Sequence, residues 1–174
     1  YLLSDMAADS VGLLDHLGFG AVHVVGVSMG GMIGQALALD APGRVLSLTS
    51  IMASTGSWEV GTPSAAGTRA LIHAPPPDDA GAIEATLEAR ELLATPGTFD
   101  AAAERALITS AIHRSFDPAG IGRQLAAIWA SGDRTSRLRS LDVPTLVIHG
   151  TADHLVDISG GEATAEAVPG ARLV

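Results

Sequence analysis

A serine between glycines is the first group in this chain that could do covalent chemistry. The stretch Gly26-Val-Ser28-Met-Gly30 follows an apolar, β-branched segment and leads into a helical pattern. A sharp turn from strand to helix lifts a serine hydroxyl above a sheet, and it needs small residues on either side. The same turn places the Met29 N–H at a helix N-terminus, where it can stabilise an oxyanion. The stretch predicts a nucleophile elbow at Ser28; a purely structural glycine turn is the alternative.

Two phosphate-binding loops compete for the same glycines. In the dinucleotide pattern G-x-G-x-x-G, Gly26 and Gly31 would align, but Ser28 would replace the middle glycine and its Cβ would hinder the pyrophosphate. The acid expected after the next strand is missing from the segment SIMAS. A P-loop requires a lysine, and the sequence has none. We therefore expect no cofactor, and the sequence shows no cluster of metal ligands.

A carboxylate in a later loop could serve the serine. Asp153 follows the apolar segment VPTLVIHG, which ends at Gly150. Active sites of open α/β sheets gather at the carboxyl ends of the strands, so a carboxylate there can orient a histidine. The alternative is that Asp153 caps the turn that follows. Asp157 is a second candidate for the acid, although the pattern favours a loop or capping role for it.

The order of elements around these residues predicts an α/β fold. Residues 21–27, 45–51 and 143–150 are typical of strands, and residues 21–27 have the pattern of a strand buried on both faces. Helical patterns precede the first strand, follow it directly at 29–39 and return at 161–168. Short connections between helix and strand imply parallel strands joined by crossovers.

A helical insertion interrupts this sheet pattern. Residues 54–77 are rich in Gly, Ser and Pro and are expected to form a stiff connection. The patterns at 79–93, 98–113 and 117–131 then predict three amphipathic helices with no strand between them. The sheet resumes only at residue 143, so two strands of one sheet are separated by the insertion.

The composition of the chain limits the classes of molecule that it can bind. With 174 residues the chain can form a substantial core, and its formal charge of −9 opposes binding to nucleic acid or to an anionic membrane. No apolar run has the length of a membrane span. There is no cysteine, which excludes disulfides and thiolate metal sites. We expect a cytoplasmic protein that acts on a small molecule.

Taken together, these segments resemble the α/β-hydrolase fold superfamily. The resemblance is carried by LSDMAADSVGLLDHLG, HVVGVSMGGMIGQALALDAPGRV, SGDRTSRLRSLDVPTLVIHGTADHLV and PGARLV, which together span nearly the whole chain. The segments SIMASTG and SGDRTSRLR are similar to the corresponding segments of a subgroup of bacterial serine esterases, which includes aclacinomycin methylesterase-like enzymes. The resemblance implies that Ser28 is the nucleophile, the Met29 N–H an oxyanion donor and Asp153 the triad acid.

The resemblance also implies a division of the chain. Residues 1–53 would form hydrolase core with the elbow strand and helix, residues 54–131 a helical cap that shapes the substrate pocket, and residues 132–174 core with the acid loop. Relatives have strands before the equivalent of Tyr1, one of which is followed by a loop with the second oxyanion donor. We therefore expect a chain truncated at both ends. Without a neighbouring strand, residues 21–27 would expose an apolar edge prone to aggregation.

The general base is the residue that the chain does not supply. In this superfamily the order is serine, acid, then histidine, and only His154 follows Asp153. Adjacent residues cannot both turn into the geometry of an acid–base pair. His113, in the insertion, is the exception that could reach the site. We expect the base to lie beyond Val174 and this chain alone to be inactive.

These expectations favour a serine hydrolase that cleaves a carboxylic ester, of hydrophobic character, through an acyl-enzyme. A cofactor-free perhydrolase or haloperoxidase, or a hydrolase of carbon–carbon bonds, would use the same triad. A non-catalytic binding protein or an inert fragment on the same scaffold is the alternative from a different class. The sequence leaves the oligomeric state open.

Overall fold

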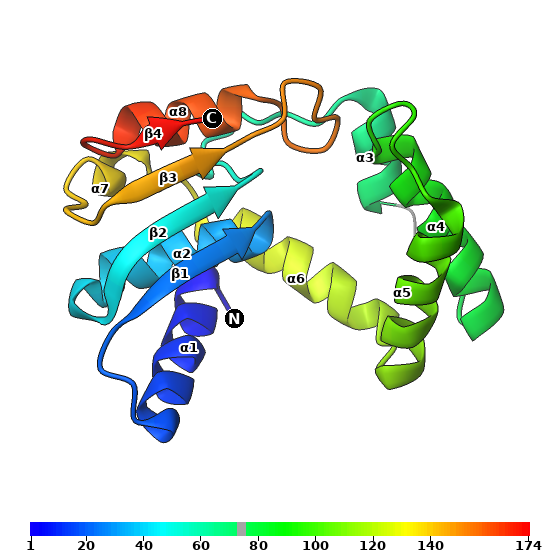
Figure 1. Ribbon diagram of the computed structural model, residues 1–174, viewed down its shortest axis with the longest axis horizontal. Helices are drawn as coiled ribbons and strands as arrows, with labels where there is room; N and C mark the ends of the chain where they lie inside the picture. Colours follow the sequence, from blue (N-terminus) through cyan, green and yellow to red (C-terminus); the bar gives the residue numbers. More distant parts are fainter. Residues whose placement is uncertain (73–75) are drawn as a thin grey trace.

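The computed structural model describes residues 1–72 and 76–174. Its elements alternate between helix and strand at both ends of the chain and are helical throughout the middle (Figure 1). In chain order they are α1 (Leu3–Leu17), β1 (Val22–Val27), α2 (Met29–Asp40), the 3-10 turn η1 (Pro42–Arg44), β2 (Val45–Ile51), α3 (Ala65–Ile72), α4 (Asp79–Leu93), α5 (Ala101–Arg114), α6 (Pro118–Ser131), α7 (Thr135–Leu138), β3 (Thr145–Ile148), α8 (Ser159–Ala167) and β4 (Arg172–Leu173).

The four strands form one parallel sheet in the order β1-β2-β3-β4. The register brings the strand ends level, because Val27 pairs with Ile51 and Ile51 with Ile148. The loops that follow β1, β2 and β3 therefore start at the same edge of the sheet. The predicted parallel α/β sheet is confirmed.

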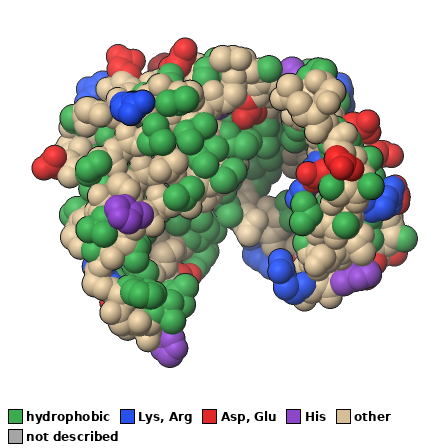
Figure 2. All heavy atoms as spheres, in the orientation of Figure 1, with side chains coloured by type: hydrophobic (Ala, Val, Ile, Leu, Met, Phe, Trp, Pro, Cys, Tyr) green, Lys and Arg blue, Asp and Glu red, His purple; other side chains and the backbone are tan. Residues whose placement is uncertain are grey.

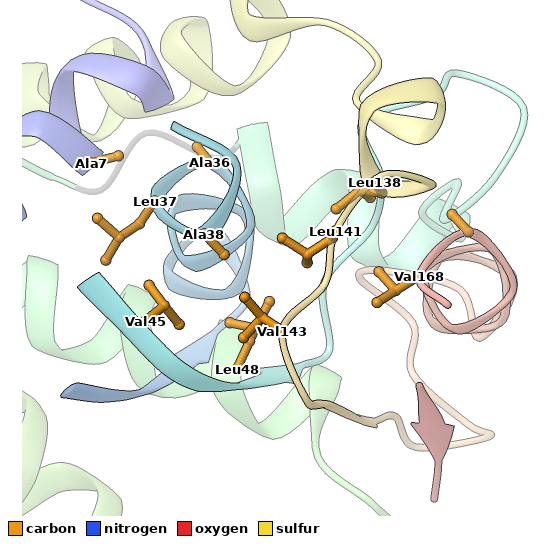
Figure 3. Close-up of a cluster of buried hydrophobic side chains, with 11 residues drawn as sticks. Ala7, Ala36, Leu37, Ala38, Val45, Leu48, Leu138, Leu141, Val143 and Val168 are labelled. Atoms are coloured by element: carbon orange, nitrogen blue, oxygen red, sulfur yellow. The ribbon is translucent and has the colours of Figure 1, made fainter. Parts of the chain in front are cut away.

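The core lies on one face of this sheet. Helix α2 packs against β1 and β2, with α1 outside it, and α7 and α8 continue the layer towards β3 and β4. Figure 3 shows side chains from these helices, from β2 and from the segment before β3 converging around α2. The buried cluster consists of Ala7, Ala36, Leu37, Ala38, Val45, Leu48, Leu138, Leu141, Val143, Ala167 and Val168. Short aliphatic side chains allow this close packing of helix on sheet.

The other face is open at β1. Val25 is 67% and Val27 55% exposed, whereas the pattern of residues 21–27 predicts a strand buried on both faces. The reason is topological: β1 is an edge strand, and the helices that pack on it lie on the α2 side. Figure 2 shows hydrophobic side chains gathered over the strands on this face.

The helical insertion forms a lobe opposite the strand ends (Figure 1). The three predicted helices appear as α4, α5 and α6, and α4 and α5 are joined by ion pairs between Arg105 and Glu84 and between Arg90 and Glu104. The stiff connection expected at 54–77 is wrong in part, because Ala65–Ile72 forms the additional helix α3. The proposed boundaries at residues 53 and 131 stay a prediction.

None of the helices in the described part of the chain is both long enough and apolar enough to cross a membrane.

Candidate functional site

Ser28 occupies a strained turn between β1 and α2. Its backbone has φ 55° and ψ −120°, a conformation that side-chain-bearing residues rarely adopt. The Ser28 N–H donates to the Ile51 carbonyl at 2.8 Å, so the turn is fixed to the end of the neighbouring strand. Ser28 is the N-cap of α2, yet its hydroxyl makes no capping hydrogen bond. The hydroxyl is thus half-buried at the sheet edge and is not used by the helix.

Close packing explains two of the glycines around this turn. A Cβ on Gly26 would overlap the carbonyl group of Gly30, and one on Gly31 would lie 2.8 Å from the Ala53 Cβ. A Cβ on Gly30 would meet no atom within 4 Å. The expectation that small residues are needed on both sides of Ser28 holds at Gly26, but on the helical side the crowded glycine is Gly31.

The backbone after Ser28 enters helix α2 directly. Helix α2 starts at Met29, and the Gly31 and Met32 N–H groups donate to the Ser28 carbonyl at 2.9 and 3.2 Å. The Met29 N–H precedes these bonds, in the first turn, where N–H groups have no acceptor within the helix. Such groups, together with the helix dipole, attract negative charge. The role of the Met29 N–H as an oxyanion donor stays a prediction.

Asp153 lies in the loop that follows β3, at the same sheet edge. Its Oδ1 accepts the N–H groups of Leu155 at 2.7 Å and Val156 at 2.9 Å. Asp153 therefore does cap its own turn, as the alternative interpretation holds, but it does so with one oxygen. Its Oδ2 lies 3.7 Å from the Nε2 of His149, beyond hydrogen-bond distance. One carboxylate oxygen fixes the loop, and the other makes no hydrogen bond within the described residues.

His149 supports this loop from inside the protein. Its Nε2 lies 2.7 Å from the Val156 carbonyl oxygen, which requires Nε2 to carry the proton. The Nδ1 atom is buried and has no hydrogen-bond partner in the described part of the chain. A Cβ on Gly161 would lie 2.5 Å from that atom, so the ring fits tightly against α8. His149 therefore has a structural role in holding this loop.

The other described histidines are exposed residues. His23 is exposed on β1 and bonds to the Ser47 hydroxyl at 2.7 Å. The side chains of His16, His113 and His154 are exposed. His73 lies outside the described residues. Among the described residues, no hydrogen bond joins a histidine ring to Ser28.

Asp157 has the capping role that the sequence favoured. Its Oδ1 accepts the Ser159 N–H at 3.0 Å, at the start of α8, and its side chain is exposed. The Ser159 hydroxyl, followed by the Ser159 N–H, holds the pKa of Asp157 below its ordinary value. The carboxylate stays ionised and stabilises the helix end.

Helix α3, which the sequence interpretation missed, packs against the acid loop. The Ser64 N–H donates to the His154 carbonyl oxygen at 3.0 Å, and a Cβ on Gly67 would overlap that same oxygen. The Ser64 hydroxyl accepts the Gly67 N–H at 3.1 Å, which is the pattern of a helix N-cap. A serine before the run AAGTRALI was the available signal, and the surrounding prolines and glycines obscured it.

A broad hollow separates the sheet edge from the α3–α6 lobe in the space-filling view (Figure 2). Two further cavities lie away from Ser28 and Asp153. One, of about 480 Å³, lies between α3 and α4 and is lined by Ile72, Leu92 and Glu88, among others. The other, of about 590 Å³, lies between Tyr1 and the start of α6. In Figure 1 the arrows of β1, β2 and β3 point towards the α3–α6 lobe, so the loops that follow these strands start on the side of this hollow.

Known proteins share this arrangement. The family described as alpha/beta hydrolase fold matches residues 1–74. Rhodomycin D methylesterase from Streptomyces peucetius is 30% identical over 198 residues, which cover 100% of this chain and 65% of the relative. A crystal structure of a hydrolase from Pseudomonas aeruginosa has a TM-score of 0.72 at 29% identity, covering 100% of this chain and 63% of that one.

The enol-lactonase from Burkholderia xenovorans is similar as well, with a TM-score of 0.71 at 27% identity over 100% of this chain and 64% of its own. The chain thus spans slightly less than two thirds of the length of the relatives it matches. The parallel sheet, the turn at Ser28 and these similarities agree. The chain has the α/β-hydrolase fold and is similar in sequence to members of that superfamily.

Proposed function

We propose that the protein containing this chain is a serine hydrolase that cleaves a carboxylic ester through an acyl-enzyme. The observation that carries the proposal is the backbone of Ser28, which is held at φ 55° between a strand and a helix N-terminus. Strain of this kind costs about 1–3 kcal/mol and is retained mainly at functional sites. A glycine would relieve the strain, so a serine at this point favours a chemical role for its hydroxyl.

In the proposed reaction, the Ser28 Oγ attacks the ester carbonyl carbon while a histidine takes its proton. The carbonyl oxygen becomes an oxyanion that the Met29 N–H and a second N–H stabilise. The tetrahedral intermediate collapses, the C–O bond breaks, and the alcohol leaves with the proton from the histidine. Water, activated by the same histidine, then hydrolyses the acyl-enzyme and restores Ser28.

Asp153 is the proposed orienting acid. Its Oδ1 is fixed by two backbone N–H groups, so the carboxylate has a defined direction before any histidine binds it. The free Oδ2 could then accept an imidazole N–H and stabilise the imidazolium that forms during proton transfer. Asp157 lacks this arrangement, because it is exposed and caps α8.

The proposal assigns the base and the second oxyanion donor to residues outside 1–174. It is supported by the described histidines, which are exposed or engaged elsewhere, and by the fraction of the relatives that this chain spans. We further propose that residues 54–131 act as a cap over the hollow beside Ser28. Two of the similar proteins are a methylesterase and an enol-lactonase, which favours a small ester or lactone as the substrate class.

The test is active-site labelling of the natural protein that contains this chain. A fluorophosphonate should label Ser28, and Ser28→Ala should abolish both labelling and hydrolysis of p-nitrophenyl esters. Asp153→Asn keeps an oxygen for the Leu155 and Val156 N–H groups and removes the charge, so it should lower kcat by about 10²–10⁴-fold with the loop intact. Asp157→Asn is the matched control and should retain activity. Labelling at another residue, or full activity of Ser28→Ala, would contradict the proposal.

A further inference from the structure

A buried arginine joins the two ends of the α3–α6 insertion. Arg134 follows α6 and precedes α7, and only 4% of its surface is exposed. Its Nη2 donates to the Ser54 carbonyl at 3.1 Å and its backbone N–H to the Thr55 carbonyl at 2.8 Å. Ser54 and Thr55 lie where the chain leaves the sheet after β2. Arg134 therefore holds together the start and the end of the insertion.

The backbones of the two ends touch at the same place. A Cβ on Gly56, which has φ 88°, would overlap the Gly132 carbonyl group and lie 3.0 Å from the Arg134 Nη1. That Nη1 donates to the Gly132 carbonyl at 3.2 Å. Hydroxyl groups add a second connection, because the Thr135 Oγ1 lies 2.8 Å from the Thr55 Oγ1. We call this contact between residues 54–56 and 132–135 the stem of the insertion.

Arg134 also connects the stem to the elbow helix. Its Nε donates to the Oε1 of Gln35 at 3.3 Å, and Gln35 is a fully buried residue of α2, two turns after Ser28. Ala53, next to Ser54, packs against Gly31 in the first turn of the same helix. These contacts fix the base of the insertion against the helix that follows Ser28.

Burying the Arg134 guanidinium costs free energy of folding, which indicates that the residue has a role beyond stability. Burial lowers the pKa of Arg134 to about 10, with the Asp133 carboxylate acting in the opposite direction and Arg137 adding to the lowering. The hydrogen-bond partners of the guanidinium in the described residues are neutral oxygens, and Asp133 is exposed. A buried cation with neutral partners is a poor way to gain stability, whereas its fork of N–H groups fixes directions well.

We propose that Arg134 is a positioning residue that sets how the insertion lies over Ser28, and so controls which ester substrates fit between them. The inference rests on the proposed function. If the stem shifts, the wall formed by the insertion moves relative to the nucleophile, while the elbow keeps its own bonds to β2. A bulky substrate depends on that wall and a small one does not. Arg134 thus acts on substrate selection and not on the bond-breaking step.

The experiment compares Arg134→Met and Arg134→Lys in the natural protein that contains this chain. Arg137→Met is the matched control, because Arg137 is an exposed neighbour paired with Asp40 at the surface. The substrates are p-nitrophenyl acetate and a p-nitrophenyl ester of a long or branched acid. We expect Arg134→Met to lower kcat/KM for the bulky ester about tenfold or more, mainly through KM, with kcat/KM for acetate changed less than about threefold.

Arg134→Lys keeps the charge but not the fork, so it should give an intermediate loss for the bulky ester. Equal losses for both esters would show a general loss of folded enzyme, and unchanged values for both would show that the stem does not matter. Either result overturns the inference.

A readout that does not depend on activity separates this inference from the proposed function. In Arg134→Met, hydrogen exchange of backbone amides should increase at residues 54–57 and 131–135 and stay unchanged in β1–β3. If the wild type fails to hydrolyse esters or to label at Ser28, the proposed function fails, and the exchange pattern still decides whether Arg134 holds the stem. Unchanged exchange at both ends of the insertion would overturn the positioning role.

Discussion

The backbone N–H of Ser28 donates to the carbonyl of Ile51 at 2.8 Å, which ties the candidate nucleophile to the last residue of β2. The bond repeats along the sheet edge, because the Met52 N–H donates to the Ile148 carbonyl at 2.9 Å and Met52 also has a positive φ, of 44°. The turns after β1 and β2 are thus supported by the next strand in the sheet. The direction of the Ser28 hydroxyl is set by the sheet as well as by its own helix.

Ser28→Gly should stabilise the protein while it removes the nucleophile. Glycine adopts the Ser28 backbone angles without strain, so we expect a gain of about 1 kcal/mol in the free energy of unfolding, or about 2–4 °C in Tm. Ser28→Ala, which also lacks the hydroxyl, should show no such gain because it keeps the Cβ. Differential scanning calorimetry of the two variants makes the comparison. Equal Tm values for the glycine and alanine variants would contradict the strain at this residue.

The glycines beside Ser28 should differ sharply in their tolerance of alanine. Gly26→Ala places a Cβ on the Gly30 carbonyl group, so it should cost about 2–3 kcal/mol or prevent folding. Gly30→Ala finds open space inside a helix, and alanine there should be neutral or should stabilise by up to about 1 kcal/mol. Chemical denaturation measures both. A tolerated Gly26→Ala would show that the turn can relax by other means.

His149→Phe should loosen the acid loop without removing a catalytic group. The Val156 carbonyl would lose its buried donor, which costs about 1–3 kcal/mol. Because Val156 also binds Asp153, the rate of fluorophosphonate labelling at Ser28 should fall as well. His154→Phe alters an exposed side chain in the same loop and is the control. If both variants label at the wild-type rate, His149 has no influence on Asp153.

The open face of β1 should cause self-association of the 174-residue chain when it is expressed alone. Val25 and Val27 expose apolar surface on an edge strand, a combination that favours pairing between copies. Val25→Thr combined with Val27→Thr keeps β-branched side chains and should shift the chain towards monomer in analytical ultracentrifugation. Val24→Thr, on the packed side of the strand, should destabilise the chain and give no such shift. A monomeric wild-type chain at micromolar concentration would contradict this prediction.

The sequence was sufficient for the strands because their patterns are local. β1, β2 and β3 each appear within a predicted segment, and the turn at Ser28 follows from the order of strand, glycines and helix. The exposure of Val25 was not readable, because an apolar strand pattern does not say which face a helix covers. Helix α3 was missed for a different reason: Ser64 is a good N-cap, but the neighbouring glycines and prolines argue for an irregular segment.

Features that join distant segments were beyond the reach of pattern analysis. The burial of Arg134 depends on Gln35, Ser54 and Gly132, which come from three different parts of the chain. In the sequence the residue is one arginine among ten, in a polar run that resembles a surface segment. The role of Gly31 is of the same kind, since its neighbour Ala53 follows the next strand.

The contact between Gly56 and Gly132 also bears on how such proteins diversify. An inserted segment whose two ends meet leaves the path of the strands unchanged, whatever length of chain lies between those ends. Helices could be lost, gained or exchanged beyond this junction during evolution while the sheet and the serine turn stayed as they are. New substrate specificities could then arise by exchange of the inserted helices, while the serine turn and the sheet stay the same.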